Sequence, residues 1–263
     1  MRVPLFQVDA FTNQPFAGNP AAVCLLDASL DDDLLRKVAA EKNLSATAFL
    51  VPRGNFYELR WFTRRCEIRL CGHATLASAY VVLNLLKPEL ENVRFETRFG
   101  GKLTVHKIAD LFSMDFPAMF PMPCPNPPQE LFQALGGPRP SHVLEANDTY
   151  IAVYESENSI RNIRPDLPRL ELLHPDAVSV TAPGDSVDFV SRYFAPSYGV
   201  PEDPVTGSAH CALTPYWTKR LGKTHLHARQ VSERGGELWC EVAGDRVILK
   251  GNAVLTMEAS LLL

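Results

Sequence analysis

Two segments of the chain combine residue types that could bind a small anion at a helix start. Trp61-Phe62-Thr63 precedes Gly72-His73-Ala74-Thr75, and Tyr193-Phe194-Ala195 precedes Thr206-Gly207-Ser208-Ala209-His210. A glycine lets the backbone approach a ligand closely, and the free N–H groups of a helix start attract an anion such as a carboxylate. We therefore predict that one strand–glycine–helix unit is used twice and that the two helix starts form a pincer.

The elements that position these segments follow from apolar patterning. Each half of the chain carries one helix that is apolar around much of its surface, which indicates burial. Because strands outnumber helices, we predict an α+β fold of two pseudo-symmetric lobes, each a curved, mostly antiparallel sheet wrapped round a central helix. The expected helices are 31–42, 73–86, 129–135, 167–173 and 208–221, and the expected strands are 5–10, 21–26, 47–51, 57–63, 93–97, 102–108, 111–116, 150–155, 177–181, 188–194, 238–242, 247–250 and 253–258.

Length supports this division, because 263 residues exceed the usual single-domain range of about 100 to 200. We predict a first lobe over 1–115 and a second over 116–263, with the alternative that the C-terminal strand returns to the first lobe. The proline-rich run 116–125 is interpreted as the connection between lobes. A polyproline ligand for a signalling domain is the alternative.

Composition excludes several classes of protein. With 46% hydrophobic and 21% charged residues the chain is typical of a soluble globular protein, and a net charge of -4 with scattered Lys and Arg argues against nucleic-acid binding. No leader-like segment follows Met1, and no apolar run reaches the roughly 18 residues of a membrane span. We expect a cytoplasmic protein that does not bind membranes.

The dispersed cysteines and histidines do not form a recognisable metal site. The six cysteines include no C-x-x-C pair, which favours reduced thiols over disulfides or zinc. His225 and His227 alternate on a possible strand, but no third ligand has suitable spacing. No metal is therefore predicted. His210 could line a cleft or pack in the core, and Asn19 could contact a ligand or cap its own turn.

Five motifs in this order resemble the PhzF-like family of phenazine biosynthesis, which belongs to the diaminopimelate epimerase superfamily. Two further segments, 191–196 and 234–238, resemble the animal branch of that family. The family motifs are Asp9-Ala10-Phe11-Thr12, Gly18-Asn19-Pro20-Ala21-Ala22-Val23, Asn43-Leu44-Ser45, Leu70-Cys71-Gly72-His73-Ala74-Thr75 and Glu202-Asp203-Pro204-Val205-Thr206-Gly207-Ser208-Ala209.

The resemblance implies a substrate in the cleft between two lobes and an isomerase that moves a proton next to a carboxylate without metal or organic cofactor. Such a site needs an acid/base group and fixed donors for the developing charge. By resemblance, His73 and Asp203 are the catalytic candidates. The substrate-binding candidates are Asn19, Gly72, His73, Gly207 and Ser208.

The chain departs from the family pattern at Ala46. The family has a catalytic glutamate directly after Asn43-Leu44-Ser45, and a methyl group cannot carry a proton. A general acid/base contributes about a hundred- to ten-thousand-fold, so we expect an impaired isomerase. Ala46 could be compensated by Asp203 and His73, or it could be an introduced change.

Other departures concern charge and sulfur. The superfamily's epimerases use two cysteines, of which Cys71 matches the first while Pro204 occupies the second position, so a two-thiol epimerase is excluded. One-base chemistry from Cys71 is an alternative, since a helix start can lower a thiol pKa. Arg64 and Arg69 stand where the family has proline and an acidic or neutral residue. They could attract acidic ligands or simply be solvated.

Three hypotheses from different classes remain open. The first is a PhzF-like isomerase acting on a small cyclic or unsaturated acid. The second is a catalytically inactive relative that binds a small carboxylate, and the third is a protein-interaction member of the family. Relatives often pair, so a homodimer is also open.

Overall fold

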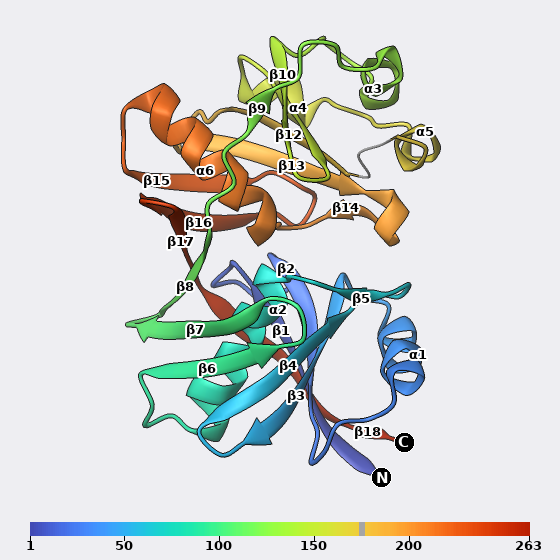
Figure 1. Cartoon of the computed structure of the whole chain (residues 1–263), viewed down its shortest axis with the longest axis vertical. Coiled ribbons are helices and arrows are strands. Elements are labelled where there is room, and N and C mark those ends of the chain that lie inside the picture. The colour runs from blue at the N-terminus through green and yellow to red at the C-terminus, as the bar shows by residue number, and fades with distance from the viewer. Residues whose placement is uncertain (174–176) are drawn as a thin grey trace. The chain divides into compact units, whose positions relative to one another are not determined.

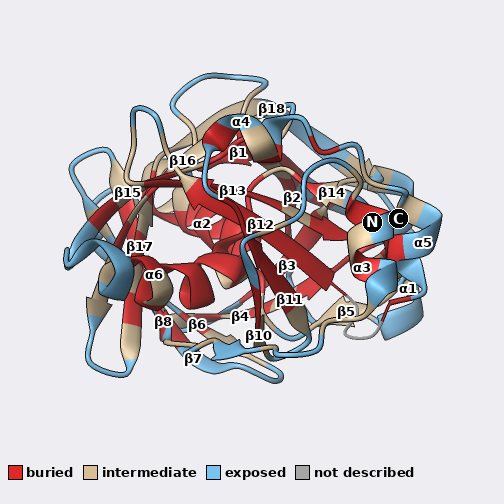
Figure 2. Cartoon of the chain, turned by 90° about the horizontal axis from the view of Figure 1, so that it is seen from above, coloured by how far each residue is buried: buried red, intermediate tan, exposed pale blue. Residues whose placement is uncertain are grey.

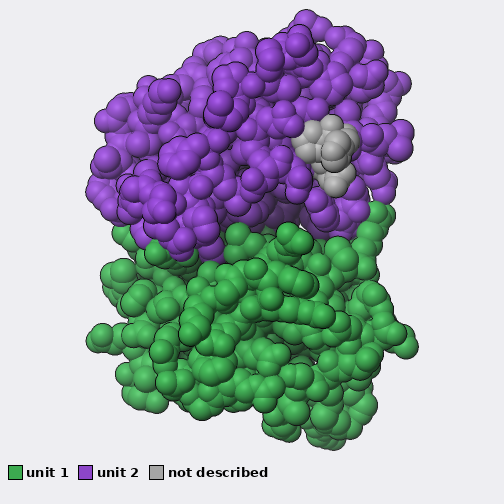
Figure 3. Space-filling view, viewed as in Figure 1, with its two compact units in different colours: residues 1–115, 250–263 green, residues 116–249 purple. Residues whose placement is uncertain are grey.

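The computed structural model describes residues 1–173 and 177–263 (Figure 1). The chain divides into two compact units, which are coloured separately in Figure 3: unit 1 comprises 1–115 and 250–263, and unit 2 comprises 116–249. The chain passes from unit 1 to unit 2 within β8 (Leu111–Pro117) and returns within β17 (Arg246–Gly251). The C-terminal strand is therefore part of unit 1.

Unit 1 is a mixed, mostly antiparallel sheet. Its strands run in the order β18–β1–β2–β3–β4–β6–β7–β8, with β5 paired to β4, and only β2–β3 and β4–β6 are parallel. Its elements are β1 (Arg2–Ala10), β2 (Asn19–Leu25), α1 (Asp32–Lys42), β3 (Ala46–Arg53), β4 (Phe56–Phe62), β5 (Glu67–Ile68), α2 (Gly72–Tyr80), η1 (Val81–Leu86), β6 (Asn92–Thr97), β7 (Gly101–Ile108), β8 and β18 (Ala253–Leu262).

Unit 2 has the same kind of sheet. The order is β9–β10–β11–β12–β13–β15–β16, with β14 paired to β13, and only β11–β12 and β13–β15 are parallel. Its elements are β9 (Met122–Pro123), α3 (Gln129–Leu135), β10 (His142–Ala146), β11 (Thr149–Val153), α4 (Glu157–Arg161), α5 (Leu167–Glu171), β12 (Ala177–Pro183), β13 (Phe189–Ala195), η2 (Pro196–Tyr198), β14 (Val200–Asp203), α6 (Gly207–Leu221), β15 (His225–Gln230), β16 (Gly236–Ala243) and β17.

The two units repeat one topology. From β1 to β7 and from β10 to β16, the pairings follow the same series: antiparallel, parallel, antiparallel, a short antiparallel strand, parallel, antiparallel. Trp61 pairs with Ile68 four residues before Gly72, and Tyr193 pairs with Asp203 four residues before Gly207. These registers make Trp61 equivalent to Tyr193 and confirm the predicted repeat and fold class.

One helix in each unit is buried, as the sequence predicts. Figure 2 shows α2 and α6 coloured as buried over most of their lengths, and α2 packs on β1, β2 and β3. A second apolar cluster, which includes Leu35 of α1, Cys24 of β2 and Phe49 of β3, lies on the other face of the unit 1 sheet. Successive side chains of a strand alternate between faces. Residues of odd number in β2 and of even number in β3 therefore face α2.

Several boundaries differ from the predicted ones. The expected helix 73–86 is α2 followed by the π-helical turn η1, in which the Lys87 N–H donates to the Val82 carbonyl five residues earlier. The proline-rich run is not only a connection, because Met122 and Pro123 pair with β10. Sequence patterning missed β5, β9, β10, α4 and β14, since segments of two to five residues carry too little periodicity.

Candidate functional site

The first helix start in unit 1 has open donors. Gly72 begins α2, and the preceding Cys71 is its N-cap, with extended backbone and, among the described residues, no side-chain capping bond. The first turn holds no acidic side chain. The first N–H groups of a helix have no partner within the helix, so this start can accept an anion.

His73 lies in this first turn in its neutral form. It is 5% exposed, and its Nδ1 lies 3.5 Å from Cys71 Sγ. Burial lowers the pKa of His73 to about 3, because desolvation disfavours the imidazolium. At neutral pH the imidazole can donate or accept one hydrogen bond but carries no charge.

Ala46 and Asn19 lie on the same face of the unit 1 sheet. Ala46 begins β3 in parallel register with Ala21, and Asn19 begins β2 two residues earlier on the same side. Both are fully buried and belong to the face toward α2. Gly18 fixes the turn before Asn19, because its φ is +64° and a Cβ there would lie 2.3 Å from the Ala10 carbonyl oxygen. The structure thus brings two of the predicted site positions together.

Asp203 in unit 2 ends β14 and is held inside a hydrogen-bonded loop. The Thr206 hydroxyl donates to Asp203 Oδ2 at 2.6 Å. Gln230 Nε2 donates to the Asp203 carbonyl oxygen at 2.6 Å, and Gln230 Oε1 accepts from the Thr206 N–H at 2.9 Å. The Ser232 hydroxyl donates to the Pro204 carbonyl at 2.8 Å. The loop that leads to Gly207 is therefore fixed by the end of β15 and the residues after it.

Gln230 is a site-building residue that the sequence analysis missed. It is fully buried and follows Leu226 and Ala228 on the inward side of β15. A polar residue at an inward position of an alternating strand must find hydrogen-bond partners. That irregularity was the available signal, although it does not identify the partners.

The second helix start resembles the first. Gly207 begins α6 after the N-cap Thr206, which makes no side-chain capping bond within the described chain, and the first turn has no acidic residue. Ser208 is partly exposed between the buried Gly207 and Ala209. This start can also accept an anion, and Asp203 and Ser208 flank it.

His210 supports the second helix start from below. Its Nδ1 donates to the Thr206 carbonyl at 2.8 Å, which matches the Thr75 hydroxyl donating to the Cys71 carbonyl at 2.6 Å in unit 1. Burial lowers the pKa of His210 to about 4, and its ring packs at 5.7 Å from the Phe189 ring. Of the two roles considered for His210, the geometry shows a packed one.

We expect His210→Ala to lower the free energy of unfolding by about 1 to 3 kcal/mol, because it deletes a buried hydrogen bond and leaves a cavity. His210→Thr should lower it less, since threonine makes the equivalent bond at Thr75 in unit 1. Urea denaturation of the two variants measures the difference. Equal losses would contradict the role of the bond.

The remaining sequence candidates lie in other surroundings. Arg64 is exposed and donates to Asn43 Oδ1 at 3.0 Å, and exposed Arg69 lies 5.9 Å from the centre of the Phe99 ring. His225 and His227 contact glutamates on β16, at 3.4 and 3.5 Å. Within residues 1–173 and 177–263, no three His, Cys, Asp or Glu residues are grouped to hold a metal ion. The same ranges contain no helix long and apolar enough to span a membrane.

Known proteins match this chain over its whole length. The Phenazine biosynthesis-like protein family (PhzC-PhzF) matches residues 8–259. An uncharacterized isomerase of Pseudomonas aeruginosa is 50% identical over 99% of both chains, and the bovine phenazine biosynthesis-like domain-containing protein is 42% identical over 99% of both. A PhzF-family structure from Enterococcus faecalis matches with a TM-score of 0.94 and 44% identity over 100% of each chain. These matches confirm the predicted family and the resemblance to animal members, although the bacterial isomerase is more identical.

Proposed function

We propose, on the premise that this chain belongs to the phenazine biosynthesis-like (PhzF-like) family, that it is an isomerase of small cyclic or unsaturated acids. Its relatives include proteins named as uncharacterized isomerases. The observation that carries the proposal is the duplicated helix start, with a glycine at the first position and no acidic residue in the first turn. Two such starts suit a substrate that has a carboxylate and develops negative charge beside it.

The proposed binding groups are the N–H groups of Gly72, His73, Gly207 and Ser208, with Asn19 as a further polar contact. They would hold the substrate carboxylate and stabilise the charge that forms when a neighbouring C–H proton is removed. An acid/base group would take that proton and return it to another carbon of the same molecule. No metal or organic cofactor is part of this proposal.

Proton transfer is the weak point of the proposed site. Ala46 occupies the position of the family glutamate, which leaves Asp203 and His73 as the proposed carriers. His73 has a pKa of about 3 and is a weak base. We therefore propose that turnover is impaired by about a hundred- to ten-thousand-fold relative to a member with a glutamate.

The alternative function is binding without turnover, either of a small carboxylate or of a protein partner. It is favoured by the buried methyl group of Ala46, which is fully enclosed in β3. In either case the proposed setting is the cytoplasm, with a homodimer as a further proposal and with no nucleic acid or membrane involved.

Deuterium incorporation from deuterated water tests the isomerase. A panel of cyclic and unsaturated amino acids is incubated with this chain and with its Ala46→Glu variant, and exchange is followed by NMR. Exchange by the variant alone supports an isomerase site that lacks its proton carrier. Exchange by both at similar rates supports Asp203 and His73 as carriers, and exchange by neither favours binding or partner recognition.

A further inference from the structure

We propose that an arginine–glutamate pair, present once in each unit, positions the short strand before each helix start. The unit 1 clamp is Arg60, Glu67 and Phe62, and the unit 2 clamp is Arg192, Glu202 and Phe194. The proposal deepens the proposed function, on which its ligand readout rests, because the clamped strands lead directly to the groups assigned to the substrate.

The unit 2 clamp holds β14 against β13. Arg192 Nε and Nη2 donate to the two carboxylate oxygens of Glu202 at 2.8 and 2.9 Å. The remaining nitrogen, Nη1, donates to the carbonyls of Ile160 and Ile163 at 3.0 and 2.9 Å. The Arg192 guanidinium also lies 5.0 Å from the centre of the Phe194 ring. Arg192 is 8% exposed, so this buried fork fixes the residue directly before Asp203.

The unit 1 clamp has the same geometry. Arg60 Nε and Nη2 donate to the two carboxylate oxygens of Glu67, both at 2.7 Å. The Arg60 guanidinium lies 5.1 Å from the centre of the Phe62 ring. The side chains of Arg60 and Glu67 are 11% and 13% exposed. Glu67 directly precedes Ile68, so this clamp fixes β5 four residues before Gly72.

The two clamps occupy equivalent positions of the repeat. Arg60 and Arg192 directly precede the equivalent Trp61 and Tyr193, and Glu67 and Glu202 directly precede the equivalent Ile68 and Asp203. The flanking positions differ in chemistry, since an aliphatic residue in unit 1 stands where unit 2 has a carboxylate. The clamp is thus shared where its neighbours are not, and the feature common to both units is the approach to a glycine helix start.

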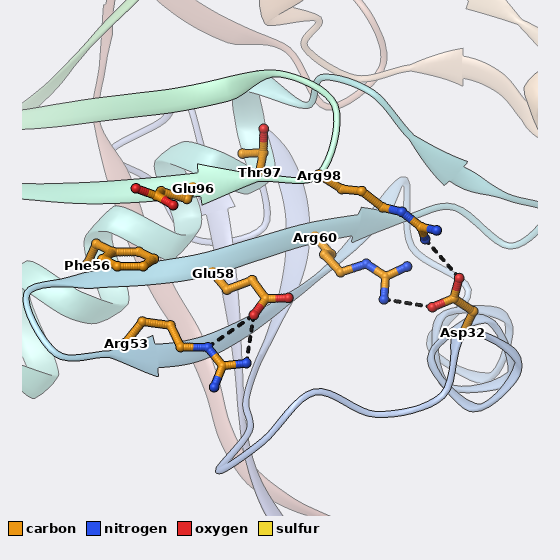
Figure 4. Close-up of a pocket in the computed structure, with 8 residues that line it drawn as sticks. All are labelled: Asp32, Arg53, Phe56, Glu58, Arg60, Glu96, Thr97 and Arg98. Atoms are coloured by element: carbon orange, nitrogen blue, oxygen red, sulfur yellow. Dashed lines mark hydrogen bonds and ion pairs between the residues drawn. The ribbon is translucent and has the colours of Figure 1, made fainter.

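The third contact of each arginine differs between units. In unit 1, Arg60 Nη1 pairs with Asp32 at 2.7 Å, and Arg98 also pairs with Asp32, at 2.9 Å. Figure 4 shows these side chains at a surface cavity of about 560 Å³. Arg53 in the same cavity pairs with Glu58 at 2.9 Å. Because each of these arginines is paired with a carboxylate, we interpret the cavity as the outer side of the unit 1 clamp and not as an anion site.

In unit 2 the loop after the clamp is held from two sides. Arg192 of β13 fixes Glu202, while Gln230 of β15 binds the Asp203 carbonyl and the Thr206 N–H. A buried ion pair often contributes little net stability compared with apolar residues, whereas its two-pronged geometry sets position and register. The clamp therefore acts on the placement of Asp203 and of the first N–H groups of α6, as a positioning pair.

Glu202→Gln tests the unit 2 clamp with little change of volume. The amide nitrogen of glutamine would face Arg192 Nη2 donor to donor, so β14 should loosen. We expect the backbone amides of 200–210 to exchange hydrogen about tenfold faster, measured by mass spectrometry without ligand. Glu237→Gln is the matched control, since Glu237 pairs with Arg229 between β15 and β16. It should leave exchange in 200–210 unchanged.

Glu67→Gln tests the unit 1 clamp in the same way, with faster exchange expected over 66–74. In the Ala46→Glu background, Glu202→Gln should also weaken binding of 2-aminobenzoate, a small cyclic carboxylate, by about tenfold. Unchanged exchange in 200–210 and 66–74, or equal changes in the Glu237→Gln control, would overturn the proposal. If no protein binds 2-aminobenzoate, the proposed function loses support while the exchange data still decide the clamp.

Discussion

The Ala46→Glu variant is expected to exchange substrate protons with water about a hundred- to ten-thousand-fold faster than the unchanged chain. Ala46 begins β3 in fixed parallel register with Ala21 and faces α2, the helix that starts with Gly72. A glutamate there restores a carboxylate at the position where the PhzF-like family has its acid/base. Deuterium incorporation into the substrate panel, followed by NMR, gives the rate ratio.

Two matched variants show whether the gain comes from a proton carrier. Ala46→Gln adds a side chain of the same size that cannot carry a proton, so it should stay at the rate of the unchanged chain. Ala177→Glu places the carboxylate at the equivalent position of unit 2, because Ala177 begins β12 in parallel register with Thr149 as Ala46 does with Ala21. Equal rates for Ala46→Glu and Ala46→Gln would contradict the role of the glutamate.

The helices of this fold were largely predictable because their signals are local. Residues 129–135 were predicted as a helix and form α3, and 208–221 forms α6 with one additional residue. The strong glycine signals also identified the repeat, since a glycine before an apolar helix marks the same turn twice. Local residue preferences and periodicity were sufficient for these elements.

The parts of the candidate site that were missed depend on contacts between strands. Gln230 reaches the loop of Asp203 across the sheet, and Arg192 reaches Glu202 from the neighbouring strand. Apolar periodicity does not predict such pairs. A signal was nevertheless present, since arginine stands directly before the aromatic pair in both repeats, at Arg60-Trp61-Phe62 and Arg192-Tyr193-Phe194. Aligning the two halves one residue further upstream would have identified the shared arginine.

Lowering the pH from 6.5 to 4.5 is expected to reduce the free energy of unfolding by about 4 kcal/mol through His73 and His210. Burial lowers their pKa values to about 3 and about 4, whereas an unfolded histidine titrates near 6.5. Above pH 6.5 neither state binds these protons, so the histidines add no pH dependence. Below it the unfolded chain binds them first, and stability falls until the folded pKa values are reached.

Repeat equivalence supplies the control for this pH dependence. Ser208 is the unit 2 equivalent of His73, and Thr75 is the unit 1 equivalent of His210. The double variant His73→Ser, His210→Thr therefore installs residues that the fold already uses at those places. Its unfolding free energy, from urea denaturation between pH 7 and 4.5, should lose most of the slope of about 1.4 kcal/mol per pH unit that each histidine contributes. Equal slopes for the two proteins would show that other groups govern acid unfolding, because the buried imidazoles are the only groups that the substitutions remove.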